Sequence, residues 1–130
     1  MKNEKTHDRI THGLSEAERE IMQVLWEMGE PVTVSGLLSE FEDSKGWKPQ
    51  TLNTFLTRLV AKGYLESQKR GNANVYSPLI SKTEFESQEA SEFIEKNYGG
   101  SAKRLIAALV DGGAVSDEEL KELQQWLGER

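Results

Sequence analysis

The spacing of the apolar residues changes partway along this chain, and that change constrains the fold more than any other feature. Over three stretches the apolar residues recur at the spacing of an amphipathic helix, and these stretches are 15–29, 34–41 and 48–62. The pattern then becomes short and extended, over 64–69 and again over 75–79, with turn-forming residues between the two. Three helices followed by a β-hairpin is the order of elements in a winged helix-turn-helix domain.

Residues with known preferences for helix ends mark the limits of these helices. Ser15 and Glu18 form the S-x-x-E capping box that opens the first helix, and Gly29 suits its end. Pro49 suits the first turn of the third helix, and the pair Lys62-Gly63 suits its last turn. The local signals therefore agree with the periodicity.

Residues 81–130 return to helical spacing, in three short helices separated by glycine pairs. Helices this short bury little apolar surface alone, so their apolar faces need a partner. A second copy of the chain is the simplest partner, and packing back onto the first domain is the alternative. The dimer hypothesis predicts an interface made by Phe85, Phe93, Ile94, Leu105, Ile106, Leu109, Leu120, Leu123, Trp126 and Leu127.

Together these patterns predict a mainly α protein with a small β-hairpin. We expect a winged helix-turn-helix DNA-binding domain over 14–80 and a three-helix dimerisation domain over 81–130. Residues 1–13 have no periodicity and are expected to form a flexible N-terminal arm.

The charge is distributed unevenly along the chain. The net charge of −6, taken alone, argues against a nucleic-acid partner. Residues 45–80, however, hold six basic side chains against Glu66 alone, a net +5, whereas the segments on either side are acidic. A basic island in an acidic chain is a candidate surface for a polyanion. A solvated face that happens to lack carboxylates fits the charge count equally well.

The third predicted helix has the surface expected of a helix that reads DNA. If its leucines face the core, its other side is short, polar and free of carboxylates. Gln50 and Asn53 can pair bidentately with adenine, and the cations farther along the helix and at the hairpin tip lie where phosphates are expected. The predicted DNA-binding residues are Lys48, Gln50, Thr51, Asn53, Thr54, Thr57, Arg58, Lys62, Lys69 and Arg70.

Composition argues against an enzyme and against a metal site. The chain has no cysteine, which excludes disulfides, thiol catalysis and thiolate metal binding. Its two histidines, His7 and His12, lie in the predicted arm without the i, i+4 spacing of a helical metal site. The glutamates of 84–95 are better explained by a solvated helix face than by a catalytic pair. We therefore expect a protein that is not an enzyme and has no cofactor or metal.

The sequence also predicts a cytoplasmic location. No apolar run approaches the roughly 20 residues that a membrane-spanning helix needs, so we expect no membrane insertion. The first twelve residues mix charged and polar side chains, unlike a signal peptide.

Three stretches of the sequence resemble the penicillinase-repressor family of BlaI/MecI/CopY-type regulators. Residues 14–26, LSEAEREIMQVLW, are similar to the first helix of the family. Residues 49–63, PQTLNTFLTRLVAKG, are similar to its recognition helix, T-x-x-T-x-x-T-R-L-x-x-K-G. The segments 98–109 and 116–127 are similar to its dimerisation helices.

The resemblance implies a homodimeric transcriptional repressor that binds a dyad-symmetric operator in double-stranded DNA. In this family a membrane sensor-protease pathway can cut the repressor, commonly at an Asn-Phe bond, and the matching bond here is Ala108–Leu109. The copper-responsive members release DNA through cysteines, which this chain lacks. Asn53 stands where the family often has Arg, which points to a different operator sequence.

The alternative function is a winged-helix protein-interaction adaptor without sequence-specific DNA binding. Winged helices serve as interaction modules in some proteins, and an acidic pI of about 5.0 suits that role. The basic island and the carboxylate-free third helix argue against it.

Overall fold

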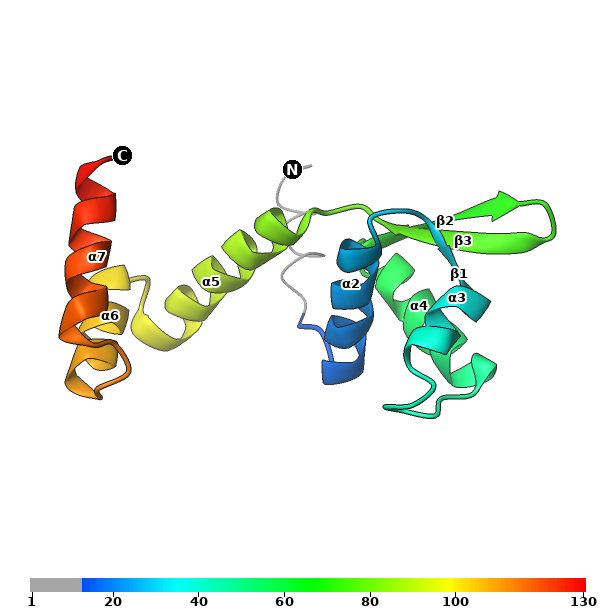
Figure 1. Ribbon diagram of the computed structural model, residues 1–130, viewed down its shortest axis with the longest axis horizontal. Helices are drawn as coiled ribbons and strands as arrows, with labels where there is room; N and C mark the ends of the chain where they lie inside the picture. Colours follow the sequence, from blue (N-terminus) through cyan, green and yellow to red (C-terminus); the bar gives the residue numbers. More distant parts are fainter. Residues whose placement is uncertain (1–12) are drawn as a thin grey trace. The chain divides into compact units, whose positions relative to one another are not determined.

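The computed structural model describes residues 13–130, which divide into two compact units, one ending at Glu89 and one beginning at Ala90. In chain order the first unit contains α2 (Glu16–Met28), β1 (Val32–Thr33), α3 (Val34–Glu40), α4 (Pro49–Ala61), β2 (Leu65–Arg70) and β3 (Ala73–Pro78) (Figure 1). Helix α5 (Lys82–Tyr98) begins in the first unit and ends in the second, which also contains α6 (Ala102–Asp111) and α7 (Asp117–Gly128). The predicted arm lies outside the described residues, apart from Gly13.

The helices begin and end close to the predicted residues. At the start of α2, the amide of Glu18 donates to Ser15 Oγ at 3.2 Å, and the amide of Ser15 donates to Glu18 Oε1 at 2.8 Å, which confirms the capping box. Gly29 ends α2 with φ of 70°, in the left-handed region that glycine enters without steric cost. Pro49 is the first residue of α4, as predicted.

The sheet has one strand more than the predicted hairpin. Its order is β1-β3-β2, with both pairs antiparallel. The hairpin pairs Leu65 with Pro78 at one end and Arg70 with Ala73 at the other, so its turn is shorter than the predicted 70–74. Strand β1 has two residues, too few for an alternating pattern to reveal, and it exists because Val32 pairs with Tyr76 across the sheet.

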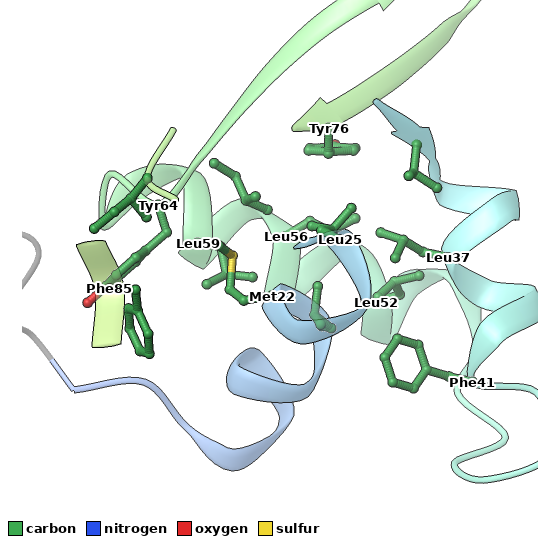
Figure 2. Packing of buried hydrophobic residues seen from close by; sticks show 14 residues of the cluster. Met22, Leu25, Leu37, Phe41, Leu52, Leu56, Leu59, Tyr64, Tyr76 and Phe85 are labelled. Carbon is green, nitrogen blue, oxygen red and sulfur yellow. The ribbon is translucent and has the colours of Figure 1, made fainter. Parts of the chain in front are cut away.

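The core of the first unit lies between α2, α3, α4 and the sheet (Figure 2). Leucines from each of the three helices meet there, and Leu25, Leu37 and Leu56 are completely buried. The helical spacing also places Leu38 inward, but that side chain is only partly buried and Leu37 takes the central position. The other buried members are Ile21, Met22, Val32, Phe41, Leu52, Leu59, Tyr64, Leu65, Tyr76, Ile80 and Phe85.

The first turn of α5 belongs to this core. Phe85 is only 6% exposed, and its ring centroid lies 5.3 Å from that of Trp26 and 5.8 Å from that of Tyr64. The assignment of Phe85 to the dimer interface is therefore corrected: its ring is enclosed by its own chain. The predicted domain boundary lies before this helix, between residues 80 and 81. The boundary between the compact units lies inside the helix, after Glu89, because Phe85 packs with the first unit.

The second unit has almost no interior of its own. Within the described residues, α6 and α7 bury no side chain completely. Their apolar residues are partly or largely exposed, with Ile106 at 40% and Trp126 at 50%. A helical unit with these exposed fractions leaves its apolar faces open to a partner.

Candidate nucleic-acid interface

Helix α4 separates its residues into a buried side and an exposed side. Leu52, Leu56 and Leu59 are completely buried and hold the helix against the core. The predicted DNA-facing residues of the helix are all exposed: Gln50, Thr51, Asn53, Thr54, Thr57 and Arg58. This side offers amides, hydroxyls and a guanidinium group, and none of these six residues is acidic.

Two threonine hydroxyls on this side already donate a hydrogen bond within the helix. Thr54 Oγ1 donates to the carbonyl of Gln50 at 3.1 Å, and Thr57 Oγ1 donates to the carbonyl of Asn53 at 2.8 Å. Such bonds fix the rotamers of the two side chains. The hydroxyl oxygens can still accept a hydrogen bond from DNA, whereas the hydroxyl hydrogens are already donated to the helix carbonyls.

Lys62, predicted to contact phosphate, has a different partner. Its ammonium lies 2.7 Å from Glu18 Oε1 and 3.2 Å from the carbonyl oxygen of Gly13. Glu18 is 1% exposed, so this carboxylate requires a counter-charge from within the protein. The structure therefore pairs the charge of Lys62 with Glu18 and joins α4 to the start of α2, and a phosphate contact by Lys62 would compete with this ion pair.

The ion pair sets the protonation of Glu18. Burial by itself raises the pKa of this carboxyl, because it disfavours the charged form. The hydrogen bond from Lys62, the amide of Ser15 and the charge of Lys62 outweigh burial, so the pKa of Glu18 lies below its ordinary value of 4.5. The carboxylate therefore stays ionised at neutral pH.

The second predicted contact surface is the wing, which we define as the β2–β3 hairpin, residues 65–78. In Figure 1 the wing extends beyond the three helices of its unit. Lys69 pairs with Asn74, and Arg70 pairs with Ala73 next to the tip, and both cations are exposed. Gly71, at the tip, has φ of 64°, which lets the chain reverse there. Lys48, the N-cap residue of α4, is exposed as well.

The remaining predicted interface residues lie on helices of the second unit. Phe93 is 48% exposed, Trp126 is 50% exposed and Leu127 is 54% exposed. Ile106 and Leu109 are also exposed, and the partly buried ones are Ile94, Leu105, Leu120 and Leu123. The Ala108–Leu109 bond lies inside α6, where the carbonyl of Ala108 accepts the amide of Gly112 at 2.9 Å. A protease can bind this bond in extended form only after the helix has locally unwound.

Sequence reasoning missed three residues near α4. Glu18 was recognised as a cap but not as the partner of Lys62. Lys45 was counted with the basic island, although its ammonium lies 3.0 Å from Glu20 Oε2. Trp47 was not singled out, although its ring contacts Phe41 and Phe55 beside the start of α4. The signal that could have identified Trp47 is an aromatic residue two positions before the proline that opens the helix.

Two negative findings apply to residues 13–130. No group of three or more His, Cys, Asp or Glu side chains in this range is arranged to hold a metal ion. The two histidines considered above lie outside the described residues. Among the described helices, none has the length and apolar character needed to cross a membrane.

Residues 14–129 match the profile of the family described as Penicillinase repressor. A penicillinase repressor of Bacillus licheniformis is 30% identical over 116 residues, which are 89% of this chain and 90% of the relative. The methicillin resistance regulatory protein MecI of Staphylococcus aureus (strain N315) is 28% identical over 123 residues, 95% of this chain and 99% of the relative. Bacillus licheniformis BlaI, solved in solution as a monomer in complex with the blaP half-operator, is 33% identical, with a TM-score of 0.48 over 55% of this chain and 87% of that chain.

Proposed function

The chain belongs to the penicillinase repressor family, and from this membership we propose that it is a homodimeric transcriptional repressor that binds a dyad-symmetric DNA operator. The relatives are named as repressors and resistance regulators, and the family is not one of enzymes. Because a repressor acts on DNA, the proposal places this chain in the cytoplasm.

The observation that carries the proposal is the exposed side of α4. Its first turns present Gln50, Thr51 and Asn53 on a helix whose opposite side is held by completely buried leucines. Amide side chains have a donor and an acceptor in a fixed geometry, which matches the N6/N7 edge of adenine in the major groove. A rigidly held helix with compact polar side chains at its start is suited to reading bases.

Four exposed cations support contacts with the DNA backbone. Arg58 lies in the last turn of α4, Lys48 precedes its first residue, and Lys69 and Arg70 lie at the end of the wing. We propose that these four residues contact phosphates of the DNA backbone. Lys62 is left out of this set, because its charge is paired with Glu18. Phosphate contacts fix the orientation of the protein on the duplex, whereas base contacts give specificity.

The exposed apolar residues of the second unit support the homodimer. An isologous interface places the same apolar surface of two copies against each other. With Phe85 removed, the proposed interface residues are Phe93, Ile94, Leu105, Ile106, Leu109, Leu120, Leu123, Trp126 and Leu127. Two copies joined in this way present two α4 helices to the two halves of a symmetric operator.

Selection from a randomised duplex library tests the proposal. The full chain is incubated with the library, bound DNA is recovered through several rounds, and the enriched pool is sequenced. We expect an inverted repeat, bound at least about a thousandfold more tightly than a shuffled duplex of the same composition. An unenriched pool would contradict the proposal and favour the protein-interaction adaptor.

A further inference from the structure

The turn that joins α3 to α4 is closed on Phe41. The carbonyl oxygen of Phe41 accepts hydrogen bonds from the amide of Lys45 at 2.9 Å and from the amide of Gly46 at 3.1 Å. Gly46 has φ of 61°, a backbone conformation that other residues rarely adopt. These two bonds reverse the chain, and the residue that follows Gly46 is Trp47.

The indole ring of Trp47 contacts two phenyl rings. Its centroid lies 4.8 Å from that of Phe41, at the end of α3, and 5.1 Å from that of Phe55, within α4. Both distances fall in the range of roughly 4.5–7 Å over which aromatic rings attract each other. Phe41 is itself 5% exposed and lies at the edge of the core beside Leu52 (Figure 2). Trp47 therefore joins the end of one helix to the body of the next.

The start of α4 has no conventional side-chain cap. Helix starts are commonly fixed by a Ser, Thr, Asp or Asn whose side chain accepts an amide of the first turn. Here the N-cap residue is Lys48, and within the described residues its side chain makes no cap hydrogen bond. Trp47 directly precedes this N-cap residue, so its aromatic contacts supply the side-chain anchoring that Lys48 does not.

We propose that Trp47 is a positioning residue for base reading, which fixes the first turns of α4 through its contacts with Phe41 and Phe55. This inference rests on the proposed function, in which Gln50, Thr51 and Asn53 reach the bases. Side chains that form a binding site must be held within about 0.5 Å of the positions in which they contact the ligand. A loosened start of α4 therefore disturbs base contacts first, whereas the cations at the wing keep their positions.

A purely structural role for Trp47 predicts a different result. Loss of core packing lowers the folded fraction, and a lower folded fraction weakens binding to every DNA sequence by the same factor. A positioning role instead lowers the ratio between specific and non-specific affinity while non-specific binding is kept. The specificity ratio, measured on folded protein, therefore separates the two roles.

The test compares four full-length proteins: wild type, Trp47→Ala, Trp47→Phe and Phe85→Leu. Phe85→Leu is the matched control, because it truncates an aromatic side chain of the same core away from the start of α4. The probes are the duplex that wild type enriches from a randomised library and a shuffled duplex of the same composition. Affinities are measured at one salt concentration, at a temperature where circular dichroism shows each protein to be folded.

We expect Trp47→Ala to lower the ratio of the two affinities by about tenfold or more, as for the loss of at least one base contact. Its affinity for the shuffled duplex falls by a much smaller factor, because Arg58, Lys69 and Arg70 lie away from the start of α4 and keep their phosphate contacts. Trp47→Phe restores most of the ratio, because a phenyl ring still contacts both neighbours. Phe85→Leu lowers the melting temperature and keeps the ratio.

A folded Trp47→Ala protein with the wild-type ratio would overturn the proposal. If that variant does not fold, Trp47→Leu replaces it, since leucine keeps apolar volume without the ring contacts. Retention of the full ratio by Trp47→Leu would overturn the proposal as well. Failure of the wild-type protein to discriminate between the two duplexes is a separate result, which refutes the proposed function itself.

Discussion

The ammonium of Lys62 lies 2.7 Å from a carboxylate oxygen of Glu18, although 44 residues separate the two in the sequence. The same carboxylate oxygen accepts the amide of Ser15 and so closes the capping box of α2. One buried group therefore joins the first turn of α2 to the end of α4. Because α4 carries the proposed base-reading residues, this ion pair holds the far end of that helix.

Lys62→Met should destabilise the first unit. The substitution keeps most of the apolar stem of Lys62 but leaves the carboxylate of Glu18 buried without its counter-charge. Breaking one side of a buried ion pair costs about 3–5 kcal/mol, and the partial exposure of Lys62 should bring the loss to about 2 kcal/mol. Urea unfolding measures this change, and the double variant Glu18→Leu/Lys62→Met should recover part of the loss. Equal stability of Lys62→Met and wild type would refute the account.

The same pair predicts a pH dependence. Because the pKa of Glu18 in the folded protein lies below the ordinary value of 4.5, its ionised form stabilises the fold at pH values above 4.5. That contribution is lost as the pH falls toward the folded-state pKa. Lys62→Met lacks the main partner that lowers this pKa, so its carboxyl binds a proton at a higher pH and its deficit relative to wild type should shrink as the pH falls toward the wild-type folded-state pKa. The free energies of unfolding of both proteins, measured from about pH 3 to about pH 7, test this convergence. This interval covers roughly the pH range in which carboxyl groups titrate.

The parts of the fold that local chemistry determines could be predicted from the sequence. The capping box at Ser15 and the helix end at Gly29 each depend on residues within a few positions of one another. The burial of the leucines of α4 could be predicted from the helical spacing of apolar residues in this one segment. These features require no knowledge of where the rest of the chain lies.

The missed features depend on contacts between distant segments. An apolar helix position looks the same whether it packs on its own chain or on a second copy, and for that reason Phe85 was assigned to the interface. A lysine near a helix end reads as a solvated cation until a buried carboxylate such as Glu18 is found beside it. Strand β1 exists only because β3 lies next to it. Spacing along the chain carries none of this information.

Asn53→Ala should flatten the base preference at one position in each half of the operator. The amide of Asn53 is exposed on the second turn of α4, and a bidentate base contact is worth about 1–3 kcal/mol of discrimination. Library selection with the variant, compared base by base with wild type, measures the effect. Gln124→Ala, which removes an exposed amide from α7, is the control and should leave every position unchanged. If the Asn53 variant selects the wild-type sequence at all positions, Asn53 does not read a base.

Arg58→Ala and Lys62→Met should differ in the salt dependence of DNA binding. Arg58 is exposed, and losing a phosphate contact lowers the slope of log affinity against log salt by about one for each contact, or about two for a symmetric dimer. The ammonium of Lys62 is paired with Glu18, so Lys62→Met should keep the wild-type slope. Titrations at several salt concentrations decide between these outcomes. If both variants lower the salt slope equally, Lys62 contacts phosphate as Arg58 does.

Leu123→Asp should convert the protein toward monomer and weaken operator binding by orders of magnitude. Leu123 is partly buried on α7, among the apolar residues proposed to meet a second copy, and each copy would then bury an unpaired carboxylate. Within a dimer the second half-site contact is effectively intramolecular, an advantage of about a hundredfold to ten-thousandfold that the monomer loses. The first unit should stay folded, since its core takes no residue from α7. Sedimentation and a gel shift on the same sample measure both effects, with Gln124→Asp as the control that adds the same charge at an exposed position of the same helix. A Leu123→Asp protein that stays dimeric, or a monomer that binds the operator as tightly as wild type, would show that DNA binding does not depend on this interface.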